Sequence, residues 1–333
     1  MCVRVCAVDW HYEEMALDDF RKVLPYLNDV ETVVLEGWGE SLLHKNLAEC
    51  VRLVKAEGPE VGFVTSGVGL TEQRIVELIG AGLDFVGFSL AGVAPQVHNR
   101  IRVNSDLNAI FQGIRWFQEV KARKKLERPR MHLVFLMLQD NLSELEGLPA
   151  LAHELGVKEI VLLNIIQIGS DWQDQQKIFS CTSGEARYEE MFARLSTEAQ
   201  RLGVKVRMPS SVATDVAVCD ENPLGNLYIA SNGEVSPCVY LFPPVGSPFK
   251  RIYCGQEYMQ EKVSFGNIFR DPFLSIWESV SYVQFRKAFL ARQKFFRDRR
   301  LALIDMSRLA ELRNSMPPEA PLSCRTCHKM LGV

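Results

Sequence analysis

The sequence of 333 residues has no apolar run long enough to cross a membrane and no excess of charge of either sign. Its formal net charge is −3, so nothing attracts the whole chain to nucleic acid or to a membrane surface. No apolar stretch of the signal-peptide type follows the first residue. We therefore expect a cytoplasmic protein with no nucleic-acid partner and no membrane partner.

Disulfide bonds are also not expected, because the cytoplasm keeps thiols reduced. The nine cysteines are then either metal ligands or ordinary buried thiols, and their spacing must separate the two. Cys50, on the apolar face of an expected helix, and Cys181 are predicted to be ordinary. Cys254 lies in an inserted stretch, PPVGSPFKRIYCGQEYMQEK, and is a candidate either for an extra thiol or for a thiol close to a substrate.

Strand-like and helix-like segments alternate over the first two thirds of the chain. Buried strands are predicted at 32–37, 61–67, 84–92, 131–138, 159–166 and 204–208. Helices are predicted at 15–27, 47–56, 71–82, 107–124, 145–155 and 185–202. This alternation predicts a parallel sheet, open or curled into a barrel, with a functional site at the carboxyl ends of the strands.

The pattern changes after Pro209. The stretch LYIASNGEVSPCVYL places Asn232-Gly233 between two β-like runs, which predicts a hairpin. A helix rich in Lys and Arg is expected at 281–300, and we interpret its basic residues as a solvated face. We predict a domain boundary near 205–215, with one domain at 1–208 and a second at 209–333.

Four cysteines of the second region have the spacing of metal ligands. Cys219 and Cys238 form C-x13-G-x4-C across the hairpin, and Cys324 and Cys327 form C-x2-C near the end of the sequence. Four thiolates from two distant segments can converge on one centre. Their spacing is compatible with a [4Fe–4S] cluster and with a zinc ion.

This cysteine pattern resembles the auxiliary-cluster region of radical S-adenosylmethionine (SAM) enzymes, known as the SPASM domain or, when shortened, the twitch domain. The stretch FGNIFRDPFLSIWESVSYVQFR (265–286) is similar to the connector of that region. The longer SPASM pattern continues with three more cysteines beyond C-x2-C, and they are not in this sequence. The resemblance therefore implies one auxiliary [4Fe–4S] cluster on four cysteines.

The first region resembles the SAM-binding barrel of the same family. LEGWGESLLH (35–44) is similar to the GGEP-type motif that receives the SAM amino group, and VTSGVGL (64–70) to the turn after the next strand. FSLAGVAPQVHNRIR (88–102) is similar to the segment where the family often has an acidic residue, here Ala91. The resemblance implies SAM contacts, with Ser89 at the ribose or carboxylate and Asn164 at the adenine edge. The full set of candidate SAM-site residues is Gly37, Trp38, Gly39, Glu40, Thr65, Ser66, Ser89 and Asn164.

The opening MCVRVCAVDW nearly contains the C-x3-C-x2-C motif that holds the catalytic cluster in this family. In one register Cys2, Cys6 and Asp9 are the ligands. In the other, Cys2 is the last cysteine of the motif, and Met15 and Phe20 follow at the family's spacing. The second register fits better, because a carboxylate is a poor substitute for a thiolate on a cluster. It implies that the first methionine is internal and that the first strand and two cysteines are missing.

The resemblance implies an α/β fold, a partial (β/α)6 TIM-like barrel whose first strand is missing, followed by a small α+β auxiliary-cluster domain with a β-hairpin. It implies reductive cleavage of SAM to a 5′-deoxyadenosyl radical that abstracts hydrogen from a peptide, protein or cofactor-precursor substrate, as in maturases. A ferredoxin or flavodoxin would supply the electron. The alternative is a non-catalytic iron–sulfur or zinc protein, or a fragment, without a complete catalytic cluster. No residue is assigned a catalytic role.

Overall fold

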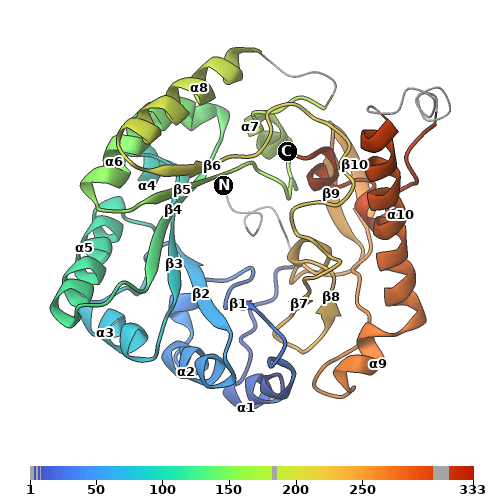
Figure 1. Ribbon diagram of the computed structural model, residues 1–333, viewed down its shortest axis with the longest axis horizontal. Helices are drawn as coiled ribbons and strands as arrows, with labels where there is room; N and C mark the ends of the chain where they lie inside the picture. The colour runs from blue at the N-terminus through green and yellow to red at the C-terminus, as the bar shows by residue number, and fades with distance from the viewer. Residues whose placement is uncertain (1–3, 5–6, 8, 182–185, 303–314) are drawn as a thin grey trace.

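The computed structural model describes residues 4, 7, 9–181, 186–302 and 315–333, without the side chains of residues 186 and 187. Six parallel strands form one curved sheet in the order β1-β2-β3-β4-β5-β6 (Figure 1). They are β1 (Thr32–Val34), β2 (Glu60–Thr65), β3 (Phe85–Leu90), β4 (Arg130–Leu136), β5 (Glu159–Leu163) and β6 (Lys205–Arg207). A sequential parallel order follows from repeated βα units and confirms the predicted α/β barrel-like class.

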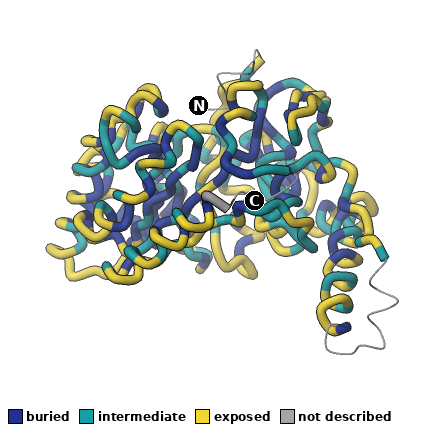
Figure 2. Tube along the Cα trace, turned by 90° about the horizontal axis from the view of Figure 1, so that it is seen from above, coloured by how far each residue is buried: buried dark blue, intermediate teal, exposed yellow. Residues whose placement is uncertain are grey.

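Helices cover the outer, convex side of this sheet. The first region contains the helices α1 (Leu17–Arg21), α2 (Leu47–Glu57), α3 (Glu72–Gly80), α4 (Pro95–Ile101), α5 (Leu107–Lys124), α6 (Leu148–Glu154), α7 (Asp171–Gln176) and α8 (Ala186–Arg201). Figure 1 places α2, α3, α5, α6 and α8 on the convex side. The central strands β2 and β3 are buried along most of their length, as expected for strands covered on both faces. Figure 2 shows that the buried parts of the chain lie mostly inside the molecule and the exposed parts on its outside.

Short 3-10 helices connect several of these elements. They are η2 (Leu24–Tyr26), η3 (Ser41–Leu43), η4 (Gln139–Gly147), η5 (Val239–Leu241), η6 (Leu322–Cys324) and η7 (His328–Leu331). The first of them, η2, shows that one predicted helix is wrong. The predicted helix at 15–27 is split into α1 and η2, and Pro25 lies in the first turn of η2. Proline has no amide hydrogen and its ring clashes with the preceding turn, so it ends a helix.

The second region contains two hairpins. The first pairs β7 (Tyr228–Ile229) with β8 (Val235–Ser236), which confirms the hairpin predicted from Asn232-Gly233. Gly233 has φ +86°, and Asn267 holds the turn by donating from Nδ2 to the carbonyl of Asn232 at 2.8 Å. The second, in the inserted stretch, pairs β9 (Phe249–Tyr253) with β10 (Gln256–Gln260). Both lie opposite the concave side of the large sheet, with β7 beside β1 (Figure 1).

The basic helix packs more deeply than predicted. It follows α9 (Phe273–Trp277) and runs as α10 (Val280–Ala302). Arg292, expected on a solvated face, is 3% exposed, pairs with Asp215 and donates to the carbonyl of Pro318 at 2.6 Å. It therefore fixes α10 to the chain that precedes the first cysteine of the second region. None of the described helices is long and apolar enough to cross a membrane.

Candidate functional site

Glu40 joins the ends of the first two strands. Its carboxylate accepts hydrogen bonds from the amide of Leu42 at 3.1 Å and from the hydroxyl of Thr65 at 2.6 Å. It also accepts from the amide of Ser66 at 2.7 Å and from its hydroxyl at 2.6 Å. A carboxylate has about four acceptor positions, so protein donors occupy the whole group. The structure thus brings three of the predicted SAM-site residues together at one edge of the sheet.

A buried histidine, which the sequence analysis did not select, continues this network. His98 is fully buried, and its Nδ1 accepts from the amide of Ala91 at 3.2 Å. Its Nε2 lies 3.0 Å from the hydroxyl of Ser105, which donates to the carbonyl of Ser66 at 2.9 Å. Burial lowers the pKa of His98 to about 4. A neutral imidazole therefore ties the end of β3 to the turn that also holds Glu40.

Asn141 performs the same task at the next strand end and was also not selected from the sequence. It is fully buried, donates from Nδ2 to the carbonyls of Ala91 at 3.0 Å and Leu136 at 2.9 Å, and accepts from the amide of Leu138 at 2.7 Å. These bonds satisfy backbone groups that leave the sheet at β3 and β4. The carboxyl edge is therefore rigid before any ligand binds.

Trp38 and its two glycines lie where the first region meets the second. The indole of Trp38 donates to the carbonyl of Val239 at 3.2 Å, and its ring packs edge-on against Tyr240 at 6.2 Å. A Cβ on Gly37 would lie 3.1 Å from the hydroxyl of Tyr228, whereas one on Gly39 would meet nothing within 4 Å. Gly37 thus permits a close approach between the regions, and Gly39 leaves open space at the end of β1.

Ser89 and Asn164 lie farther along the same edge. Ser89 is half-buried in β3, and Asn164 follows β5 with 6% of its surface exposed. Asn164 donates from Nδ2 to the carbonyl of Ser210 at 3.5 Å, while its Oδ1 is buried without a hydrogen-bond partner. A buried carbonyl oxygen without a donor is costly. Asn164 therefore keeps one buried acceptor that none of the described protein groups satisfies.

A cavity of about 270 Å³ lies beside these strand ends. Its lining includes Asp9, Trp10, Trp38, Gln167 and Lys250. The inserted stretch closes one wall, because the amide of Gly246 donates to Asp9 at 2.6 Å. The cavity thus combines an aromatic wall with an acidic and a basic side chain, a setting that suits a polar organic substrate.

The four predicted cysteine ligands of the second region converge on one small cavity. Cys219, Cys238, Cys324 and Cys327 all line it, together with Tyr240, Lys329 and others. Cys238 directly follows the first hairpin, at the start of η5, while Cys324 ends η6 and Cys327 precedes η7. All four are free thiols. The hairpin and the late C-x2-C therefore meet as the spacing predicts.

The distances between these thiols favour a cluster over a single ion. Zinc bound by four thiolates at about 2.3 Å holds their sulfurs about 3.8 Å apart. Within the part of the chain that the structure describes, no three of these four sulfurs lie within 4.8 Å of one another. A [4Fe–4S] cube binds each thiolate to a different iron and so spreads its ligands more widely. The cavity fits the iron–sulfur alternative better.

The charges around the thiols also fit a metal centre. Burial raises the pKa of Cys219 to about 12 and the pKa of the other three thiols above their ordinary value. Buried thiols of this kind ionise together only when a metal supplies positive charge. Arg251 is 1% exposed and donates to the carbonyl of Tyr240 at 2.9 Å. Lys329 lines the same cavity and pairs with Asp220 at 2.7 Å, so cationic groups oppose the negative charge of bound thiolates.

The remaining cysteines give mixed outcomes. Cys50 is a buried free thiol in α2, as predicted. The expectation that no disulfide forms is wrong, because Cys181 and Cys254 are bonded to each other. The predicted ligand Cys2 and its neighbour Cys6 lie outside the described residues.

Comparisons with known families agree with this site. The sequence model of the radical SAM superfamily matches residues 5–152, and that of the iron–sulfur cluster-binding SPASM domain matches residues 219–328. The matched segments contain the strand ends up to β4 and all four cysteines of the small cavity.

The individual relatives differ in how much of this chain they match. A tungsten-containing aldehyde ferredoxin oxidoreductase cofactor-modifying protein of Pyrococcus furiosus is 25% identical over 83% of this chain and 77% of its own length. A PqqA peptide cyclase of Rhizobium meliloti is 32% identical over 30% of this chain and 27% of its own length.

Solved structures share the fold. SuiB of Streptococcus suis, bound to S-adenosylmethionine, has a TM-score of 0.60 and 14% identity over 81% of this chain. The enzyme anSMEcpe with bound AdoMet has a TM-score of 0.52 and 13% identity over 81% of this chain and 73% of its own. This chain spans 60% of the length of SuiB.

Proposed function

Since this chain belongs to the radical SAM superfamily and carries a C-terminal SPASM domain, we propose that it modifies a peptide, protein or cofactor precursor by hydrogen abstraction. When bound, a reduced [4Fe–4S] cluster supplies the electron that cleaves SAM to methionine and a 5′-deoxyadenosyl radical. The observation that carries the proposal is the hydrogen-bonded group of Glu40, Thr65 and Ser66 at the strand ends. The same chain has a cavity large enough for a small organic molecule and a cavity lined by four cysteines.

The chain's own residues have separate tasks in this proposal. Glu40 positions the turn after β2, since protein donors fill its acceptor positions. The open space beside Gly39 and the backbone carbonyls there receive the SAM ammonium group. The unpartnered Oδ1 of Asn164 accepts from the adenine amine, and Ser89 binds the ribose or carboxylate.

The second region completes the enzyme as the domain at 209–333. Cys219, Cys238, Cys324 and Cys327 hold one auxiliary [4Fe–4S] cluster, and Cys2 is a ligand of the catalytic cluster. Trp38 and the inserted stretch exclude water from the substrate cavity. A ferredoxin or flavodoxin in the cytoplasm donates the electron. Both the peptide-modifying and the cofactor-modifying relatives support a maturase-like role.

Iron, sulfide and SAM cleavage test this proposal on anaerobically prepared, reconstituted protein. In protein that carries the complete C-x3-C-x2-C motif, we expect about eight irons per chain, as two [4Fe–4S] clusters require, and formation of 5′-deoxyadenosine after reduction. About four irons without SAM cleavage would support the alternative, a non-catalytic iron–sulfur protein. Zinc without sulfide would exclude the iron–sulfur assignment.

The adenine contact has its own test. Asn164→Ala removes the unpartnered oxygen, and we expect SAM to bind about tenfold more weakly, the loss of one hydrogen bond to a neutral group. Asn108→Ala, at an exposed position in α5, is the matched control. Equal SAM dissociation constants in the two variants, measured by calorimetry, would contradict the assignment.

A further inference from the structure

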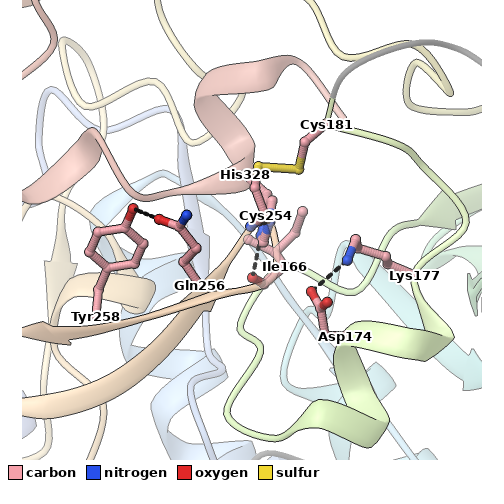
Figure 3. Close-up of a disulfide and its surroundings, with 8 residues drawn as sticks. All are labelled: Ile166, Asp174, Lys177, Cys181, Cys254, Gln256, Tyr258 and His328. Atoms are coloured by element: carbon pink, nitrogen blue, oxygen red, sulfur yellow. Dashed lines mark hydrogen bonds and ion pairs between the residues drawn. A yellow bond between two sulfur atoms is a disulfide. The ribbon is translucent and has the colours of Figure 1, made fainter.

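A second sulfur-containing group lies apart from the four-cysteine cavity. Cys181, Cys254 and His328 place one ligand atom each within 4.8 Å of the others, and the described residues contain no other such trio (Figure 3). Three segments supply them: the chain after α7, the turn between β9 and β10, and the first residue of η7. The two sulfurs are bonded in this structure, with Cα atoms 5.7 Å apart.

The turn that carries Cys254 is an unusual place for a cysteine. Tyr253 pairs with Gln256, so Cys254 and Gly255 alone form the loop of the hairpin. Both have positive φ, 50° and 78°, which is the pattern of a type I′ turn. Asn or Asp normally takes the first of these positions, because other side chains clash with the backbone there. A cysteine in this conformation indicates that its sulfur has a role that another residue type could not fill.

His328 directs its Nε2 toward the amide of Cys254, whose hydrogen bond a zinc ion at this nitrogen would replace. The amide of Cys254 donates to its Nε2 at 3.2 Å, so this nitrogen carries a lone pair and the proton is on Nδ1. Nδ1 faces the carbonyl of Ile166 at 3.5 Å, and the ring lies between Phe179 and Tyr253, 5.1 and 5.0 Å away. A histidine that binds a metal through one nitrogen commonly directs the other N–H to a backbone carbonyl in this way.

We propose that Cys181, Cys254 and His328 form a zinc site in the reduced protein, and that the disulfide is its metal-free, oxidised state. Zinc at about 2.3 Å from sulfur and about 2.0 Å from nitrogen separates its ligand atoms by about 3.5–3.8 Å. The three ligand atoms lie within 4.8 Å of one another, and the two sulfurs must separate from their bonded distance to reach this range. Two thiolates neutralise the ion, so the buried surroundings of His328 receive no net charge. A water molecule completes the tetrahedron.

The disulfide must be reduced before zinc can bind. A thiol or phosphine reductant adds two electrons to the S–S bond, and two protons from water give two thiols. Zinc then displaces both protons to solvent as it binds the thiolates. Neither cysteine lines the four-cysteine cavity, so the site is filled or emptied without removing a ligand of the auxiliary cluster.

Zinc uptake by the whole, cluster-loaded chain tests the proposal. The protein is kept anaerobic, treated or not with a phosphine, and alkylated in a parallel sample to count free thiols by mass. Zinc chloride is then titrated against a competing indicator, with iron measured in each sample. We expect one zinc per reduced chain, none per oxidised chain, and X-ray absorption at the zinc edge that reports two sulfur ligands and one imidazole.

Single variants identify the ligands. Cys181→Ala and Cys254→Ala should each bind zinc at least about 100-fold more weakly, because removing a direct ligand costs more than removing a supporting contact. Cys50→Ala, a free thiol elsewhere, should bind like the wild type. Unchanged iron in all three variants shows that each has folded around its clusters.

Two results would overturn the zinc site. One is zinc binding of equal strength in Cys181→Ala, Cys254→Ala and Cys50→Ala. The other is no zinc binding by wild-type protein, whether alkylation finds both thiols free or finds the bond resistant to the reductant. Neither result touches the proposed radical chemistry, which is measured separately by iron content and SAM cleavage.

Discussion

The strand-end network of Glu40, His98 and Asn141 differs from the four-cysteine cavity in whether protein groups alone satisfy its buried polar atoms. At the strand ends, Glu40, His98 and Asn141 have protein partners for their buried polar atoms. In the cavity, four thiols with raised pKa values surround a small void. The strand-end network is thus organised by the protein alone, whereas the four thiols depend on a metal centre to ionise.

The largest effect expected from this difference is loss of metal at the cavity. Cys238→Ala removes a proposed ligand that is held at the end of the first hairpin. We expect the iron content to fall by about four per chain, since a [4Fe–4S] cluster is normally held by four thiolates. Iron and sulfide analysis measures this, and Cys50→Ala is the control because that buried thiol lies in α2. If Cys238→Ala retained all of its iron, the assignment of a metal centre to the cavity would be wrong.

Metal removal separates the two regions within one sample. If iron is extracted with a chelator under reducing conditions, we expect amide exchange to rise at least tenfold around residues 235–241 and 322–331. The strands β2 to β5 should keep their protection, because their core and caps contain no metal ligand. Hydrogen exchange with mass spectrometry reads both regions at once. Equal loss of protection in both would show that the strand ends also depend on the metal.

A variant of Glu40 tests whether protein hydrogen bonds alone hold the strand ends. Glu40→Ala leaves the Thr65 hydroxyl and the Ser66 amide without an acceptor, and we expect a loss of about 2–3 kcal/mol of unfolding free energy. Iron at the four cysteines should not change. Chemical denaturation measures the loss, with Glu77→Ala as the control, since Glu77 is exposed on α3. A loss as small as that of the control would mean that the turn does not need Glu40.

Much of this arrangement could be predicted from local sequence signals. The helix predicted at 107–124 has the same bounds as α5, because Asp106 caps its start and a run of Lys and Arg follows its apolar stripe. The convergence of the four cysteines was also predicted, since the hairpin turn fixes two of them. Both depend on contacts within a short stretch or on a strongly patterned spacing.

The unpredicted features depend on distant contacts. Cys181 and Cys254 are 73 residues apart, and no local pattern pairs them. His98 lies in a segment quoted for its resemblance, but its partner Ser105 comes from the following loop. Arg292 looks like one of several solvated basic residues until α10 is packed against Asp215. The sequence shows which residues are polar, while tertiary packing decides which of them are buried.

The smallest expected effect, a pH dependence, reports on the strand-end network alone. His98 has a pKa of about 4 in the folded protein, lowered by burial and by the nearby Arg102, against about 6.5 when unfolded. Above pH 6.5 both states are neutral and the full stability is present. As the pH falls from 6.5 toward 4, only the unfolded chain takes up the proton, so stability is lost, by up to about 3 kcal/mol.

The variant His98→Gln isolates this contribution from other groups that titrate in the same range, such as His328, whose pKa burial also lowers to about 4. We expect His98→Gln to be less stable at pH 7 but to lose less stability between pH 6.5 and 4 than the wild type does. Urea denaturation at a series of pH values gives both slopes. Parallel slopes would mean that His98 is protonated as readily in the folded chain as in the unfolded one. The hydrogen bond between the amide of Ala91 and Nδ1 would then have to break without cost, and the strand ends would be less rigid than their contacts imply.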